Sequence, residues 1–145
     1  MSAQIPISPR PTLQAAISLL QGAKLPTEDL TDSHVEQFFY SGPSAQPTGL
    51  VGLEIFGDVA LLRSLVVTPE RRGFGEGHRL LGHAEREAWA HGVRAIYLLT
   101  TTAEPFFSKF GYTRALREEA PAAIQATREF AGICPASSTF MSKQL

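Results

Sequence analysis

The chain has 145 residues, and 43% of them are hydrophobic, so it has room for one domain, residues 1–145, that buries a sizeable core. The 13 Lys and Arg residues nearly balance the 14 Asp and Glu residues, which leaves a formal net charge of -1. This balance disfavours nucleic acid or an anionic membrane as a partner and favours a small molecule.

The first half of the chain predicts four strands and a helix. Gln4–Ser8 is typical of an edge strand, where Pro6 is tolerated. Apolar residues spaced by three and four from Thr12 predict a helix that ends near Gly22 and covers a sheet. The further predicted strands are Val35–Tyr40, Leu50–Phe56 and Val59–Thr68. The first two of these form a predicted hairpin, and the third is predicted to be central, with both faces covered.

The second half alternates helices and strands. After a glycine turn at residues 73–77, helical spacing predicts a helix that ends at Gly92, and a buried strand follows at Ala95–Thr100. This order predicts two parallel neighbouring strands joined by a right-handed crossover. The other predicted elements are a helix capped by Thr101-Thr102-Ala103-Glu104 that runs through Phe110, a strand starting at Tyr112-Thr113, a helix at Ala122–Phe130 and a strand at Ser138–Ser142. The predicted fold class is mixed α/β.

The segment from Leu65 to His78 runs from a strand end through the glycine turn into a helix. The first amides of a helix have no internal acceptor and lie at the positive end of its dipole, so they suit a diphosphate. Glycines allow close approach, and the Arg71-Arg72 pair adds positive charge. We therefore predict an anion site at this turn.

Two other phosphate-binding fingerprints fit the turn poorly. A dinucleotide fingerprint needs a third glycine three residues after the second, where this chain has His78, and the turn lies in the middle of the chain. A Walker loop would end in Gly-Lys-Ser or Gly-Lys-Thr, but here the turn continues Gly77-His78-Arg79.

The one cysteine, Cys134, excludes an intrachain disulfide and fits a reducing compartment. Residues 1–11 lack the apolar stretch of a secretory signal, and no run has the length of a membrane span. We therefore expect a cytoplasmic protein. The four histidines lack metal-ligand spacing, so we expect solvated or capping roles for them and predict no metal.

The run Arg72-Gly73-Phe74-Gly75-Glu76-Gly77 satisfies the pattern of Arg or Gln, two residues, Gly, one residue, then Gly or Ala. With Leu65, Val67 and Pro69 upstream and Phe106–Tyr112 downstream, the chain resembles the GCN5-related N-acetyltransferase family, most specifically over residues 50–114. Within that family, Leu98–Phe107 and Phe130–Ser137 are similar to acetyltransferases associated with arsenic resistance, which suggests detoxification of an amino-acid-like toxicant.

The resemblance implies a fold and a reaction. The implied fold is a mostly antiparallel mixed sheet with helices on both faces, whose parallel fourth and fifth strands splay apart. The implied reaction transfers acetyl from acetyl-coenzyme A to a primary amine of a small molecule by direct attack in a ternary complex. The residues implied to bind the coenzyme are Leu65, Val66, Val67, Arg71, Arg72, Gly73, Phe74, Gly75, Gly77, His78, Thr100 and Phe106. The implied oxyanion donor is the Val66 N–H.

Two alternatives to this enzyme stay open at the level of sequence. Phe107 stands where many relatives have a tyrosine that protonates the leaving thiolate, and Tyr112 is either a substitute for it or a core aromatic. A coenzyme A-binding sensor or inactive partner is therefore one alternative, and acetylation of a protein lysine or amino terminus is the other. The sequence is compatible with a monomer or a homodimer.

A two-residue loop at Gly57-Asp58 would pair Phe56 with Val59, Glu54 with Leu61 and Gly52 with Arg63. Glu54 and Arg63 then lie on one face as diagonal neighbours, together with Leu65, while Ser64 points to the opposite face. One interpretation is a structural ion pair. In the other, Arg63 binds a substrate carboxylate while Glu54 accepts the proton of the acceptor ammonium.

Overall fold

The computed structural model describes residues 5–145. Within them, the strands form a mixed sheet in the order β1-β2-β3-β4-β5-β7-β6, in which only β4 and β5 pair in parallel. The strands are β1 Ile7–Pro9, β2 Phe38–Ser41, β3 Gly49–Phe56, β4 Val59–Val67, β5 Ala95–Thr100, β6 Thr113–Arg114 and β7 Thr139–Gln144. The predicted mixed α/β class, the β2–β3 hairpin and the parallel central pair are confirmed.

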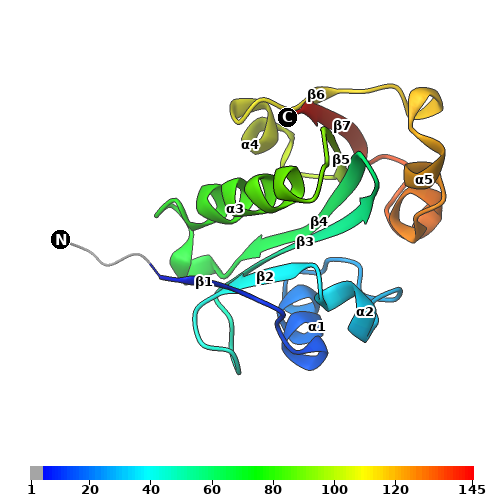
Figure 1. The fold of residues 1–145 in the computed structure, drawn as a ribbon. Coiled ribbons are helices and arrows are strands. Elements are labelled where there is room, and N and C mark those ends of the chain that lie inside the picture. Colours follow the sequence, from blue (N-terminus) through cyan, green and yellow to red (C-terminus); the bar gives the residue numbers. More distant parts are fainter. Residues whose placement is uncertain (1–4) are drawn as a thin grey trace.

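Helices cover both faces of the sheet (Figure 1). They are α1 Leu13–Gly22, α2 Asp32–Val35, α3 Glu76–Ala90, α4 Glu104–Lys109 and α5 Ala122–Gln125, with a single π-helical turn at Glu129–Ile133 and 3-10 turns at Pro69–Arg71 and Arg117–Glu119. On one face, α3 and α4 pack against a core that includes Leu53 and Leu62. On the other, α1 and α2 pack around Leu50 and Val66. None of the helices in residues 5–145 has both the length and the apolar character needed to cross a membrane.

The β3–β4 hairpin confirms the predicted register, because Phe56 pairs with Val59, Glu54 with Leu61 and Gly52 with Arg63. Past Arg63 the register shifts, and Leu50 pairs with Val66, so β4 uses one more residue than β3. Ser64 has a φ of 61° at this point, in the left-handed region that L-residues rarely adopt. The extra residue forms a β-bulge in β4.

The bulge overturns the predicted faces of two residues. Leu65 packs with Leu62 in the core under α3, on the face opposite to that of Arg63. The Ser64 hydroxyl accepts a hydrogen bond from Arg63 Nε at 3.2 Å, so Ser64 points toward Arg63 and not away from it. A period-two pattern cannot hold across a bulge, because the extra residue reverses the alternation of side chains.

Other element boundaries also differ from the prediction. The helix expected at Ala122–Phe130 is shorter, because α5 ends at Gln125. The helix expected from Thr101 starts at Glu104, and the Ala103 N–H is satisfied by the Thr100 hydroxyl at 3.0 Å. The first strand is β1, Ile7–Pro9, and Gln4 of the predicted edge strand lies outside the described residues.

Candidate active site

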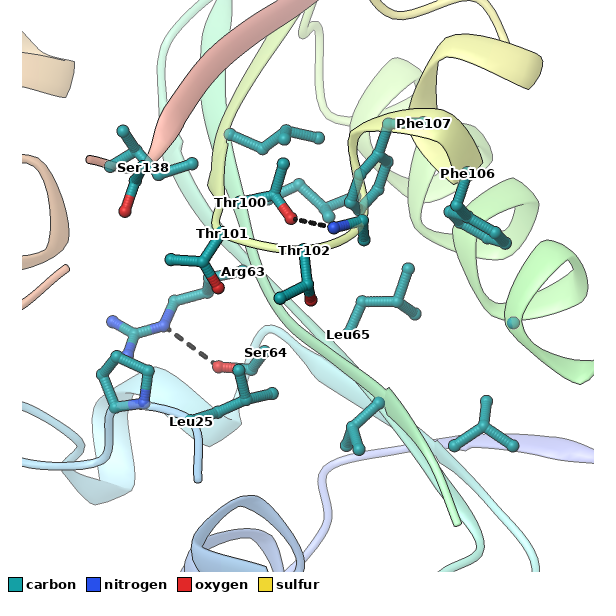
Figure 2. Close-up of a pocket in the computed structure, with 18 of the residues that line it drawn as sticks. Leu25, Arg63, Ser64, Leu65, Thr100, Thr101, Thr102, Phe106, Phe107 and Ser138 are labelled. Atoms are coloured by element: carbon teal, nitrogen blue, oxygen red, sulfur yellow. Dashed lines mark hydrogen bonds between the residues drawn. The ribbon is translucent and has the colours of Figure 1, made fainter. Parts of the chain in front are cut away.

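A cleft opens where β4 and β5 separate. The two strands pair only from Val59 with Ala95 to Leu61 with Tyr97, although β4 continues to Val67 and β5 to Thr100. The resulting cleft has a volume of about 1060 Å³. Figure 2 shows its walls, with Leu65 from β4, Thr100 from β5 and Phe106 from α4.

Nearly all the predicted coenzyme-binding residues line this cleft. They are Leu65, Val66, Val67, Arg71, Arg72, Gly73, Gly75, Gly77, His78, Thr100 and Phe106. Phe74 is not among the lining residues, and its side chain is 75% exposed beside Arg71. Arg63 lines the cleft, whereas Glu54 does not.

The N-terminus of α3 presents backbone donors at one end of the cleft. The first helical bond runs from Arg79 N–H to the Gly75 carbonyl at 3.0 Å, so the three preceding N–H groups, of residues 76–78, have no acceptor within the helix. Gly73 and Gly75 have φ values of 86° and 82°, which turn the chain sharply into the helix. This geometry suits an anion. The Arg72 N–H is not free for such an anion, because it donates to Pro69 O at 3.3 Å.

Glu76 fixes the start of α3 to the sheet. Its buried carboxylate accepts hydrogen bonds from Ser41 Oγ at 2.6 Å, Thr48 Oγ1 at 2.8 Å and Arg71 Nε at 3.1 Å. Burial alone would raise the pKa of Glu76, but these donors hold it below its ordinary value. The glycine turn is therefore held in place by a charged side chain at its C-terminal end.

Replacing Glu76 with alanine is expected to destabilise the protein by about 3 kcal/mol, because two hydroxyls and Arg71 lose their shared acceptor. Since the pKa of Glu76 is lowered in the folded state, its stabilisation is present above the unfolded-state pKa and is lost as the pH falls through the folded-state pKa. Urea unfolding at pH 7 measures the difference. Glu70→Ala, at an exposed neighbouring carboxylate, is the control, and equal stability of the two variants would contradict the anchoring role.

Backbone alternation decides which β4 amides face the cleft. The Leu53 N–H donates to Gln37 O, next to β2. The N–H and C=O groups of odd-numbered β3 residues therefore point toward β2, and those of even-numbered β3 residues point toward β4. Leu50 pairs with Val66, and the Thr68 N–H donates to Thr48 O at 2.8 Å. The Val66 N–H therefore lies on the β3 side. The backbone groups of residues 65 and 67 lie on the side of the cleft.

Arg63 holds three carboxylates at the other end of the cleft. Its buried guanidinium pairs with both oxygens of Asp29, with Glu54 at 2.9 Å and with Glu129 at 3.3 Å, and Nε donates to Ser64. We call Arg63, Asp29, Glu54 and Glu129 the Arg63 cluster. The predicted Glu54–Arg63 ion pair is confirmed. The guanidinium donors are already directed at protein acceptors.

The carboxylates of the Arg63 cluster differ in their tendency to ionise. Burial opposes ionisation of Asp29, but the Arg63 hydrogen bond and charge hold the pKa of Asp29 below its ordinary value. Burial raises the pKa of Glu129 to about 7, with the Asp29 and Glu54 charges adding to the effect and Arg63 opposing it.

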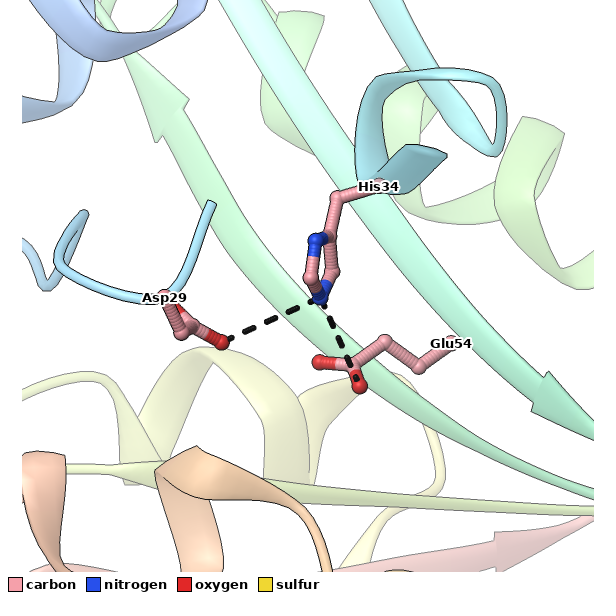
Figure 3. Close-up of side chains that lie close together, drawn as sticks. All are labelled: Asp29, His34 and Glu54. Carbon is pink, nitrogen blue, oxygen red and sulfur yellow. Dashed lines mark ion pairs between the residues drawn. The ribbon is translucent and has the colours of Figure 1, made fainter. Parts of the chain in front are cut away.

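His34 lies beside Asp29 and Glu54, two members of the Arg63 cluster (Figure 3). Its Nε2 lies 4.0 Å from an oxygen of Asp29 and 4.0 Å from one of Glu54, and the three side chains form a compact group. His34 Nδ1 accepts a hydrogen bond from the Thr31 N–H at 3.2 Å, so the expected capping role is confirmed for this histidine. Arg63 pairs with the carboxylates of both Asp29 and Glu54.

Residues 35–114, more than half of the chain, match the family model of the acetyltransferase (GNAT) domain. The chain belongs to the GNAT acetyltransferase family. An amino-acid acetyltransferase of Ralstonia nicotianae is 38% identical over 63 residues, which are 43% of this chain and 14% of that protein. The chain therefore matches only a small part of the length of this curated relative.

Solved structures share the fold of nearly all of the chain. N-acetylglutamate synthase from Neisseria gonorrhoeae, complexed with coenzyme A and N-acetyl-glutamate, superimposes with a TM-score of 0.81 at 21% identity, over 100% of this chain and 36% of that one. A Mycobacterium tuberculosis protein, Rv2747, in complex with coenzyme A gives 0.75 at 16% identity, over 97% of this chain and 99% of that one. The expected GNAT-like sheet with splayed β4 and β5 is confirmed.

The GNAT site of this chain lacks the tyrosine expected on α4. Phe107 is buried, and its ring packs edge-on against Tyr112 (Figure 2 shows Phe107). The Tyr112 hydroxyl donates to Glu85 at 2.9 Å, and burial together with the Glu85 charge raises its pKa. Tyr112 is not among the residues that line the cleft, so it is a core aromatic and no substitute for the missing tyrosine.

The sequence did not predict the roles of three polar residues of this GNAT domain. Asp29 and Glu129 come from irregular segments far apart in the chain, and nothing local to them indicates that both reach Arg63. Glu76 stands inside the glycine turn, and nothing in the sequence indicates that its carboxylate reaches Ser41 and Thr48. The one signal in the sequence is Arg63 on a strand predicted to be central, because a buried charge there needs acidic partners.

Proposed function

We propose that the chain transfers the acetyl group of acetyl-coenzyme A to the primary amine of a small, amino-acid-like molecule. The observation that carries the proposal is the cleft between β4 and β5, with unpaired amides at one end and the Arg63 cluster at the other. Its volume of about 1060 Å³ suits a long ligand together with a small acceptor. The relatives named amino-acid acetyltransferase support the acceptor class.

The N–H groups of residues 73–78 hold the coenzyme diphosphate in this proposal, with the side chains of Arg71 and Arg72 beside them. The Arg72 side chain already reaches β4, where its Nε donates to Val67 O at 3.0 Å. Backbone groups of Leu65 and Val67 pair with the pantetheine arm. Thr100 and Phe106 form the opposite wall.

Leu65 takes the oxyanion role that the sequence assigned to Val66. The β3–β4 ladder directs the Val66 N–H toward Leu50, whereas the Leu65 N–H lies on the cleft side of the bulge. A donor preorganised at this point stabilises the negative charge that develops on the thioester oxygen when the amine attacks.

Arg63 organises its three carboxylates in this proposal and does not bind a substrate carboxylate. A substrate carboxylate would have to displace Asp29, Glu54 or Glu129 from the buried guanidinium. Removing a carboxylate from such a pair leaves a buried charge without its partner, which is costly. The role of Glu54 as a base stays a prediction.

Phe107 favours one second function, that of a coenzyme A-binding sensor or inactive partner. Its buried ring offers no proton to a leaving thiolate. Such a protein would bind coenzyme A without turning over acetyl-coenzyme A. Arsenic resistance, protein acetylation, a cytoplasmic location and the choice between monomer and homodimer likewise stay predictions.

Release of free thiol from acetyl-coenzyme A tests the two functions. We expect release with α-amino acids or amino-acid-like arsenicals, and little with polyamines. Acetylated product is confirmed by mass. Calorimetric binding of coenzyme A without thiol release for any amine of this panel would favour the sensor.

A further inference from the structure

Glu129 is the one carboxylate of the Arg63 cluster that lines the cleft. Its side chain is 95% buried and lies 3.3 Å from Arg63 Nη2. The π-helical turn Glu129–Ile133 carries it, and the Cys134 N–H donates to Glu129 O at 3.3 Å at the end of that turn. Asp29 and Glu54 do not line the cleft, and both are bonded to Arg63.

Glu129 lies at the point along the cleft where the acceptor amine would bind in the proposed reaction. Successive β4 residues rise by about 3.3 Å each, so Val67, Leu65 and Arg63 mark three points along the wall. Val67 lies next to Arg72 at the diphosphate end. Leu65 marks the proposed thioester, which leaves Arg63 and Glu129 at the far side of the reacting carbon.

The other titratable side chains of the lining that are neither Lys nor Arg are Glu28, Glu76, His78 and Cys134. Glu76 is bonded to three donors under the glycine turn. His78 stacks on Phe110 at 4.0 Å in the first turn of α3, at the diphosphate end. Neither one reaches the acceptor end.

Glu28, which precedes Asp29 in the chain, and Cys134, which follows the Glu129 turn, also line the cleft but are unsuited to take a proton from an amine. Glu28 is exposed, so water competes for its carboxylate. Burial raises the pKa of the Cys134 thiol to about 12, with the Glu129 charge adding to the effect, and this thiol stays protonated at neutral pH.

We propose that Glu129 is the catalytic base, which binds the acceptor ammonium and removes its proton. This inference rests on the proposed acetyl transfer. The Glu129 carboxylate takes one proton from the ammonium, and the neutral amine then attacks the thioester carbon. The C–N bond forms and the C–S bond breaks. A second amine proton passes through water to the coenzyme thiolate, and Glu129 returns its own proton to solvent.

The charges around Glu129 fit this role. The groups that face it are Arg63 from β4, Asp29 from the loop before α2, Glu54 from β3 and the Cys134 thiol, with His34 next to the two carboxylates. Three carboxylates against one guanidinium leave an excess of negative charge that attracts a cation. A pKa near 7 makes Glu129 an effective base at neutral pH.

Replacing Glu129 with glutamine tests the proposal. With the best amine of the thiol-release panel, we expect kcat/KM to fall by roughly 100-fold or more, as general-base catalysis typically contributes. For the wild type, kcat/KM should rise with pH around pH 7. For Glu129→Gln, this rise should be absent. Hydroxylamine is neutral at pH 7.5 and needs no base, so Glu129→Gln should acetylate it at a rate within a few-fold of wild type.

Three measurements keep the result interpretable. Glu118→Gln removes an exposed carboxylate that does not line the cleft and should leave kcat/KM unchanged, and calorimetry should find coenzyme A binding intact in Glu129→Gln. Glu129→Asp, which keeps a carboxylate, should retain part of the rate and its rise with pH. Unchanged kinetics of Glu129→Gln would contradict the role of Glu129 as the base. So would a loss of rate with hydroxylamine as large as that with the amine. Absence of thiol release by the wild type with every amine overturns the acetyl transfer itself.

Discussion

Replacing Gly75 with valine is expected to weaken coenzyme A binding at least about tenfold. Gly75 has a φ of 82°, which a β-branched residue adopts only with strain, and a Cβ there would point into open space at the proposed diphosphate site. Losing one hydrogen bond to a charged group costs about 1.5–3 kcal/mol, and 1.4 kcal/mol corresponds to a factor of ten in Kd. Isothermal titration calorimetry with coenzyme A measures the change.

Gly92→Val is the matched control for this substitution. Gly92 follows the other end of α3, has a φ of 91° and also has no atom within 4 Å of an added Cβ. Both variants carry the same backbone strain, so they should lose similar stability on thermal unfolding. Equal affinity of the two variants for coenzyme A would contradict the proposed role of the glycine turn in binding the coenzyme.

Replacing Arg63 with methionine is expected to destabilise the folded protein by about 3–5 kcal/mol at pH 7.5. The substitution removes the only guanidinium bonded to Asp29, Glu54 and Glu129 within the described residues and leaves three buried or half-buried carboxylates without compensation. Chemical unfolding at fixed pH measures the loss. Arg86→Met, at an exposed site on α3, should change stability by less than about 0.5 kcal/mol.

The pH dependence of the Arg63→Met loss provides a second check. The pKa of Glu129 is raised in the folded state from 4.5 to about 7, so its protonated form favours folding and that contribution is lost as the pH rises through 7. Without Arg63 the repulsion among the carboxylates grows as Glu129 ionises. The loss should therefore be smaller at pH 5.5 than at pH 8. A loss independent of pH would mean that packing, and not charge, accounts for the effect.

The sequence predicted the parts of the fold that local patterns determine. Branched aliphatic residues at Val59–Thr68 indicated a central strand, and Gly57-Asp58 set the register that brings Glu54 next to Arg63. The glycine turn was predicted to precede a helix, and α3 starts there with free backbone donors at one end of the cleft; that these donors bind an anion stays a prediction.

The parts that depend on tertiary contacts were beyond the sequence. The bulge at Ser64 has no turn residue to announce it, since a serine with positive φ inside a strand is favoured only by its surroundings. It moved Leu65 to the α3 face, and in our proposal it makes the Leu65 N–H the cleft donor in place of that of Val66. Glu129 reaches Arg63 across 66 positions of the chain from an irregular turn, and no periodic pattern marks such a residue.

A crystal structure of the chain with coenzyme A tests the central claim most directly. We predict that the diphosphate oxygens lie within hydrogen-bonding distance of the N–H groups of residues 73–78 at the start of α3, with the pantetheine arm between β4 and β5. A diphosphate bound elsewhere, or a coenzyme that leaves the gap between these strands empty, would contradict the account.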